Sequence, residues 1–209
     1  MTRQRSSRNR YRPTASASDR PRGKLRIIGG RFRRRLLPVA DRPGLRPTPD
    51  RVRETLFNWL AFDLAGHRVL DLFAGTGALG LEALSRGASQ AHFVETDAEV
   101  ARLIETNLAT LGATGQVVVR DALDFLDEPA TPFDVVFLDP PFRQDLAGPA
   151  CDLLERRGWL DDDALIYVET ESSLPPQVPG RWTLHREVKA GDSHGRLYRR
   201  SPSASGDAC

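Results

Sequence analysis

The sequence predicts an α/β protein with a mostly parallel, seven-stranded sheet, a C-terminal antiparallel hairpin and a small N-terminal basic β-hairpin. From residue 68 onward, short apolar strands alternate with helices, a pattern typical of a parallel sheet covered on both faces. A glycine-rich turn follows the first of these strands, within residues 75–80. After residue 170 the alternation stops, and two strand-like segments follow a proline-rich loop.

The N-terminal hairpin is predicted at residues 25–39. Its apolar segment Leu25–Ile28 is followed by Gly29–Gly30, a dipeptide typical of a tight turn, and the returning strand is expected to begin at Arg31. A helix is expected next, with Thr48 as its N-cap and a proline at its first helical position.

The remaining elements follow in order along the chain. Strands are expected where short runs of apolar and β-branched residues occur, and helices where apolar residues recur at helical spacing. The predicted strands are residues 68–73, 91–95, 116–120, 133–139 and 164–169, and the predicted helices are residues 78–86, 98–111, 122–126 and 146–157. A closing hairpin is predicted from residues 182–189 and 195–200. An antiparallel hairpin after parallel strands suits a methyltransferase sheet better than a dehydrogenase sheet.

Charge divides the chain unevenly. Of its 30 Lys and Arg residues, 15 lie within residues 1–46 beside only two acidic residues, whereas residues 47–209 hold 26 acidic residues. An acidic domain with a strongly basic leading segment indicates a polyanionic partner, most simply a nucleic acid, with a solubilising tail as the alternative. The expected organisation is a disordered Arg/Ser-rich arm at 1–23, a basic β-hairpin and linking helix at 24–60, the main domain at 61–200 and a tail at 201–209.

The glycine-rich turn indicates a nucleotide-like ligand. Gly75, Gly77 and Gly80 match the pattern G-x-G-x-x-G, and Glu95 lies where a dinucleotide-binding fold places its ribose-binding acid. Asp71, four residues before the first glycine, separates two classes of ligand, because its carboxylate would repel a pyrophosphate and attract a cation. We therefore predict S-adenosylmethionine as the cofactor, since its sulfonium and amino groups are both cationic.

Two carboxylates at strand ends fit the same ligand. Glu95 can accept hydrogen bonds from both ribose hydroxyls, and Asp121 can accept from the adenine amino group, with Ala122 offering a backbone N–H. A helix N-cap is the alternative role for Asp121. The full candidate cofactor set is Asp71, Phe73, Gly75, Thr76, Gly77, Glu95, Thr96, Asp121 and Ala122.

The candidate catalytic loop follows the apolar strand 133–139 and consists of Asp139, Pro140, Pro141 and Phe142. The exocyclic nitrogen of guanine or adenine is a poor nucleophile because its lone pair is delocalised into the ring. Asp139 and the Pro140 carbonyl can accept hydrogen bonds from its two N–H groups, which localises the lone pair and stabilises the positive charge that develops on nitrogen. Phe142 can stack on a base flipped out of its helix. The predicted reaction is methyl transfer to a base nitrogen, with an ordinary Pro-Pro turn as the alternative.

These motifs resemble the bacterial small-subunit ribosomal RNA guanine-N2 methyltransferases, which have the Rossmann-like class I methyltransferase fold. The resemblance spans roughly residues 25–200, and the run from Arg46 to Glu54 is its most specific part. The matching stretches are Leu45–Leu60, Leu70–Gly87, Asp139–Phe142, Trp159–Leu160, Ala164–Glu169 and Leu184–Arg186.

The resemblance implies methylation of N2 of one guanine in 16S ribosomal RNA, within the small ribosomal subunit or its assembly intermediate. It assigns cofactor positions to Asp71, Gly75, Gly77, Glu95 and Asp121, and catalytic positions to Asp139–Phe142. The candidate RNA-binding residues are Arg31, Arg33, Arg34 and Arg35 in the hairpin and Arg46, Thr48, Arg51 and Arg53 in the segment that links it to the active site. We expect a monomeric cytoplasmic protein that uses neither a membrane nor a metal.

Three other functions remain open on the residues alone. An adenine-N6 methyltransferase acting on DNA or RNA often has Asn and Tyr where this chain has Asp139 and Phe142. A nicotinamide oxidoreductase would share the glycine turn and Glu95, and a non-catalytic RNA-binding assembly factor would share the basic segment. The scattered histidines and two cysteines do not suggest a metal site.

Overall fold

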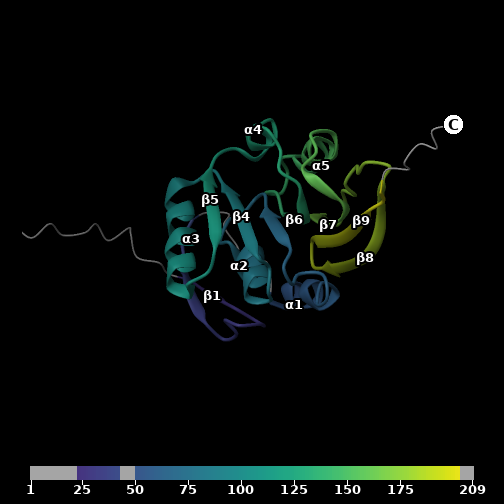
Figure 1. The fold of residues 1–209 in the computed structure, drawn as a ribbon. Helices are drawn as coiled ribbons and strands as arrows, with labels where there is room; N and C mark the ends of the chain where they lie inside the picture. The colour runs from purple at the N-terminus through teal and green to yellow at the C-terminus, as the bar shows by residue number, and fades with distance from the viewer. Residues whose placement is uncertain (1–22, 43–49, 203–209) are drawn as a thin grey trace, which may run out of the picture.

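The computed structural model describes residues 23–42 and 50–202, which form a two-stranded and a seven-stranded sheet (Figure 1). The small sheet pairs β1 (Gly23–Arg26) with β2 (Leu36–Val39). The strands of the large sheet are β3 (Arg68–Asp71), β4 (Gln90–Glu95), β5 (Gly115–Val119), β6 (Phe133–Leu138), β7 (Leu160–Glu171), β8 (Trp182–Ala190) and β9 (Ser193–Arg200). They lie in the order β5-β4-β3-β6-β7-β9-β8, and the pairings made by β9 are antiparallel while the others are parallel. The predicted fold class is confirmed.

Helices cover both faces of the large sheet (Figure 1). The described helices are α1 (Asp50–Trp59), α2 (Ala78–Ser85), α3 (Ala98–Leu111), α4 (Ala122–Leu126) and α5 (Ala147–Arg156). The first three share one apolar core with the small sheet and with Phe93 and Phe137 of the large sheet. The last two share the opposite core with Phe133 and Trp159. None of the described helices is long and apolar enough to cross a membrane.

The strand order places β3 beside β6, and their connections lead away to opposite sides of the sheet. The crevice outside the carboxyl ends of two such strands is the usual ligand site of an open α/β sheet. Asp71 ends β3 and pairs with Phe137 of β6, so Asp139 emerges two residues further along the adjacent strand. The fold therefore brings the two motifs that the sequence singled out to one edge.

The N-terminal hairpin differs from the prediction in where its second strand begins. Residues 31–34 form a turn, and β2 starts only at Leu36. Arg34 has a left-handed backbone, with a φ of 69°, which a continuous strand does not allow. The arginines of this segment therefore project from a loop and do not alternate across a strand.

β7 also begins earlier than the predicted residue 164. Leu160 pairs with Phe133, and a register shift before Val135 accommodates the exposed acidic residues 161–163. These acids interrupt the apolar run, which is why the pattern predicted a later start.

Candidate functional site

The glycine turn joins β3 to α2 through backbone conformations that L side chains rarely adopt. Gly75 has a φ of 50° and Gly77 a φ of 74°. The Gly77 N–H donates to the Ala74 carbonyl (2.7 Å), and the Ala74 N–H donates to the Val94 carbonyl in β4 (2.9 Å). Because glycine adopts these angles without strain, the turn can hold the amino end of α2, with its partial positive charge, beside two strand ends.

Asp71 lies beneath this turn and is only 2% exposed. Its Oδ2 accepts a hydrogen bond from the Gly80 N–H at 2.9 Å. Burial raises the pKa of Asp71 to about 7, while the Gly80 hydrogen bond lowers this pKa and the nearby Glu95 charge raises it. Among the described residues we find no cationic side chain paired with Asp71. A cationic ligand would therefore supply the positive partner that this buried carboxylate lacks near neutral pH.

Glu95 is bound to the same turn from the end of β4. Its Oε2 accepts from the Gly75 N–H and its Oε1 accepts from the Asp97 N–H, each at 2.8 Å. The carboxylate thus lies beside the turn, as the sequence predicts, and backbone donors hold it there. A ribose that engages both oxygens would have to share or replace these hydrogen bonds.

Asp121 follows β5 and caps α4. Its Oδ1 accepts from the N–H groups of Leu123 (2.8 Å) and Asp124 (3.2 Å). The N-cap that was the alternative role for this residue is therefore formed, and its second oxygen remains for an adenine amino group. The other candidate cofactor residues differ in exposure: Thr76 and Ala122 are buried, Phe73 is half-buried and Thr96 is exposed.

The candidate catalytic loop leaves β6 between the ends of β3 and β7. Asp139 is half-buried, Pro140 is buried, and Pro141 and Phe142 are exposed. Phe142 is 42% exposed, so a large part of its ring is available to a planar ligand. The loop is joined to the end of β7, because the backbone N–H that follows Phe142 donates to the carboxylate of Glu171.

A buried tyrosine and glutamate of β7 lie next to this loop and were missed by sequence reasoning. The Tyr167 hydroxyl donates to Glu169 Oε2 (2.7 Å), and the Ser193 hydroxyl donates to the other oxygen of Glu169. The pKa of Tyr167 is raised well above its ordinary value by burial, by Glu169 and also by the charge of Asp139. A carboxylate at the end of a continuous apolar strand was the signal that could have revealed this pair.

The hairpin arginines lie at the opposite end of the sheet from the catalytic loop. α2 runs back from the glycine turn to the amino ends of the strands, where the Ser89 N–H donates to the His67 carbonyl just before β3 (2.9 Å). The Arg31 N–H donates to the Ser85 carbonyl at this end of α2 (2.6 Å). Eight helical residues span about 12 Å, which is a minimum for the separation. The structure therefore does not bring Arg31, Arg33, Arg34 and Arg35 to the catalytic loop.

These four arginines are exposed. The Arg35 guanidinium donates to the Thr110 carbonyl at the end of α3 (3.2 Å), and the Arg31 guanidinium lies 5.2 Å from the centre of the Phe32 ring. Within residues 23–42 and 50–202, no carboxylate forms an ion pair with Arg33 or Arg34. These two side chains are thus free to meet an anion.

Arg53 does not meet the expectation of an exposed RNA contact. It is fully buried, and its Nη2 donates to the Arg26 carbonyl (3.0 Å) and to Asp50 Oδ1 (2.6 Å). The side chain therefore joins α1 to the end of β1. Arg51 is exposed on α1, whereas Arg46 and Thr48 lie outside the described residues.

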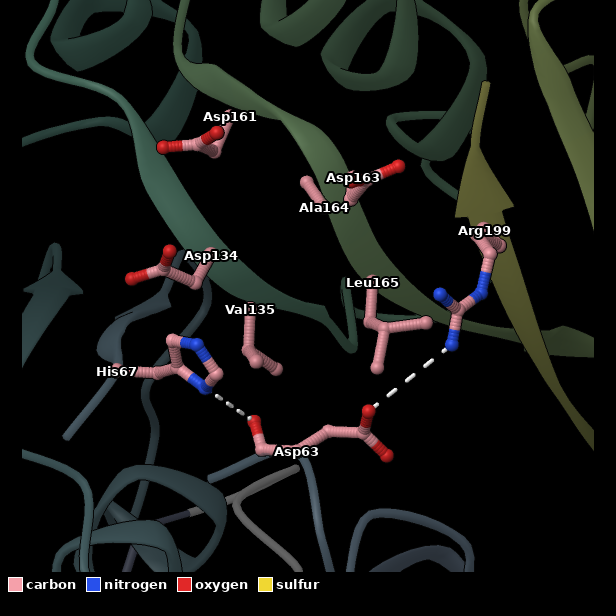
Figure 2. A pocket seen from close by; sticks show the side chains of 9 residues that line it. All are labelled: Asp63, His67, Asp134, Val135, Asp161, Asp163, Ala164, Leu165 and Arg199. Carbon is pink, nitrogen blue, oxygen red and sulfur yellow. Dashed lines mark hydrogen bonds and ion pairs between the residues drawn. The ribbon is translucent and has the colours of Figure 1, made fainter. Parts of the chain in front are cut away.

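A pocket of about 150 Å³ opens at the amino ends of β6 and β7, and Figure 2 shows its acidic lining. The carbonyl of Asp63 lies 2.9 Å from His67 Nδ1, and its carboxylate lies 3.9 Å from Arg199 Nη2. The pocket contains none of the predicted site residues, and its four aspartates would repel a polyanion. The described part of the chain contains no group of three or more His, Cys, Asp or Glu side chains arranged to hold a metal ion.

Known proteins match nearly the whole described chain. Residues 25–199 match the model of a family described as Conserved hypothetical protein 95. The chain is 54% identical over 188 residues to the Ribosomal RNA small subunit methyltransferase D of Escherichia coli strain K12, which covers 89% of this chain and 95% of that protein. A solved structure of an Escherichia coli protein provisionally named a methyltransferase has a TM-score of 0.81 and 52% identity, covering 86% of this chain and 99% of that one.

A more distant solved structure shares the fold alone. It is an RNA methyltransferase from Salinibacter ruber in complex with S-adenosyl-L-homocysteine, with a TM-score of 0.58 and 16% identity. The match covers 78% of this chain and 98% of that one.

Proposed function

The chain belongs to the family described as Conserved hypothetical protein 95, and from this premise we propose that it transfers a methyl group from S-adenosylmethionine to N2 of a guanine in small-subunit ribosomal RNA. The observation that carries the proposal is that Asp71 and Asp139 lie at the ends of the adjacent strands β3 and β6. One carboxylate suits a cationic cofactor and the other suits an exocyclic amino group.

The residues around the glycine turn fit the cofactor. When bound, S-adenosylmethionine supplies an electrophilic methyl group on a positively charged sulfur. Asp71 offers a buried negative charge to the cationic end of this molecule, and Gly75 and Gly77 allow its close approach to the backbone. Glu95 and Asp121 stand at the ends of the next two strands, where they can accept hydrogen bonds from the ribose and the adenine.

The cofactor affinity is expected to fall as the pH is lowered from about 8 to about 6, because the pKa of Asp71 is about 7 and protonation removes the charge that attracts the cation. Below the pKa, the dissociation constant should rise by up to about tenfold per pH unit. Isothermal titration calorimetry of S-adenosylmethionine at several pH values measures this. In Asp71→Asn the same pH change should leave the already weak affinity unaltered. A wild-type affinity that stays constant across this range would contradict the assigned role.

The catalytic loop activates the base. Asp139 and the Pro140 carbonyl accept hydrogen bonds from the exocyclic amino group, which directs the nitrogen lone pair toward the methyl carbon and stabilises the charge that develops. Phe142, which is 42% exposed, stacks on the ring of the flipped guanine. Fixing the two reacting atoms in line removes much of the entropic barrier.

The proposed RNA-binding residues lie on two neighbouring elements. Arg51 lies on α1, which Arg53 joins to the Arg26 carbonyl at the end of β1, and the hairpin arginines lie at the amino ends of the strands, so a bound RNA extends beyond the target nucleotide. Such a footprint suits a folded RNA in a small ribosomal subunit or its assembly intermediate. We propose that the protein acts there as a monomer in the cytoplasm. Transfer of labelled methyl groups into small subunits that lack the modification tests this proposal, and label absent from their RNA would sink it.

Replacing Arg33, Arg34 and Arg35 with alanine is expected to weaken RNA binding and to flatten its dependence on salt. Three lost phosphate contacts would reduce the slope of log affinity against log salt concentration by about two to three. The affinity for S-adenosylmethionine should stay nearly unchanged, because the loop and the glycine turn lie at opposite ends of α2. Filter binding over a salt series and calorimetry of the cofactor measure the two effects. An equal loss of cofactor affinity would contradict the assignment of RNA binding to the hairpin arginines and of cofactor binding to the distant glycine turn.

A further inference from the structure

The hairpin loop at residues 28–35, here called the arginine loop, is fastened to α2 by a buried carboxylate. The Ile28 and Gly29 N–H groups donate to the two carboxylate oxygens of Glu82, each at 2.8 Å. Glu82 is fully buried, and its Oε1 also accepts from Arg86 Nε at 2.8 Å. The bonds from Ile28 and Gly29 to Glu82 are charge-assisted and join segments more than 50 residues apart, so they position the start of the loop against the helix.

Ser85, one turn further along α2, binds the same loop three times. Its carbonyl accepts from the Arg31 N–H (2.6 Å), and its hydroxyl accepts from the Phe32 N–H (2.9 Å) and donates to the Gly29 carbonyl (2.5 Å). Gly30 has a φ of 72°, and a Cβ at this position would lie only 1.8 Å from the Ser85 carbonyl oxygen. The loop backbone therefore lies directly against the helix.

These contacts require a charged group in an apolar setting. All eight residues of α2 are buried, and a carboxylate there carries a desolvation cost that an apolar side chain would avoid. The carboxylate satisfies two loop N–H groups that have no partner within their own hairpin, and Arg33 and Arg34 of the same loop are exposed. α2 also begins at the glycine turn. A single buried helix therefore links the turn, at the carboxyl ends of the strands, to the arginine loop at their amino ends.

We propose that Glu82 and Ser85 are positioning residues for RNA recognition, which hold the arginine loop as a rigid anchor at a fixed distance from the catalytic loop. The inference rests on the proposed function, because it takes RNA as the substrate. A rigid anchor binds without the entropic cost of ordering a loop, so loosening it raises the KM for RNA. The kcat at saturating RNA changes little, because neither residue lies near Asp139.

Removing the charge of Glu82 tests the proposal clearly, because simple electrostatics and the anchor predict opposite changes in RNA affinity. Glu82→Gln removes a negative charge that contacts the backbone of a loop with four exposed arginines, which by electrostatics alone would tighten RNA binding. The anchor predicts the opposite, a loss of RNA affinity of about tenfold, comparable to losing one or two phosphate contacts. Glu105→Gln is the matched control, because Glu105 is exposed on α3 and the change in charge is the same.

The experiment measures small-subunit RNA binding, KM and kcat for RNA, cofactor affinity and the rate of limited trypsin cleavage after Arg33 and Arg34. For Glu82→Gln and Ser85→Ala we expect weaker RNA binding, a raised KM with kcat retained, faster cleavage in the loop and unchanged cofactor affinity. RNA affinity and cleavage equal to those of Glu105→Gln would overturn the proposal. Should Glu82→Gln fail to fold, Ser85→Ala carries the test with the same readouts. Failure of the wild-type protein to methylate RNA would instead overturn the proposed function.

Discussion

Replacing Asp139 with alanine is expected to lower the rate of methyl transfer by about 100- to 1,000-fold, the usual effect of removing one preorganised electrostatic contact to a transition state. The affinity for S-adenosylmethionine should remain within about twofold of wild type, because we propose that Asp71, Glu95 and Asp121, and not Asp139, bind the cofactor. The rate is measured in a single turnover with enzyme in excess over RNA, and the affinity is measured by calorimetry.

Two further variants sharpen this result. Asp139→Asn keeps the shape and one acceptor oxygen, so it should retain more activity than the alanine variant but less than wild type. Asp152→Asn removes a charge from an exposed position of α5 and should leave the rate unchanged. If Asp139→Ala abolished cofactor binding while the rate per bound complex stayed at the wild-type level, Asp139 would belong to the cofactor site.

Replacing Asp71 with asparagine is expected to abolish tight cofactor binding and at the same time to stabilise the unliganded protein at about pH 8. The folded-state pKa of Asp71, about 7, lies above the value of 3.8 for a free side chain. Such a group favours folding fully below its unfolded pKa, and this contribution is lost as the pH rises through the folded pKa. Above pH 7 the buried charge therefore costs free energy, and the neutral amide should raise the free energy of unfolding by about 1–3 kcal/mol.

Urea unfolding at several pH values measures the stability effect, and calorimetry measures cofactor binding. The difference in stability between Asp71→Asn and wild type should shrink as the pH falls from 7 toward 4, because the wild-type carboxyl becomes protonated. Asp152→Asn again serves as the control for a lost surface charge. Unaltered affinity for S-adenosylmethionine in Asp71→Asn would refute the role assigned to this carboxylate.

The sheet and the cofactor turn could be predicted because their signals are local. An apolar run that ends in a carboxylate or a glycine identifies a strand and also the edge of the sheet where a ligand can bind. Asp71, Glu95 and Asp139 are examples. The parallel order follows from alternation with helices, so neighbouring strands present these ends on the same side.

The predictions that were wrong concern residues whose positions depend on contacts between distant segments of the chain. Arg53 shares a helical face with Leu56, Phe57 and Leu60, at spacings of three, four and seven residues, and this face is buried. Its charge suggested a surface position, but its guanidinium donates a hydrogen bond to a backbone carbonyl of β1. The arginine loop lies where Glu82 and Ser85 hold it, and no pattern within the hairpin indicates that distant pairing.

The proposed activity of this chain is methylation of the exocyclic N2 of a guanine in small-subunit ribosomal RNA. It is tested most directly by incubating small subunits that lack the modification with labelled S-adenosylmethionine and identifying the labelled nucleoside. We expect label in N2-methylguanosine with the wild-type protein and none with Asp139→Ala. Label in N6-methyladenosine, or none in the RNA although the cofactor is bound, would contradict it.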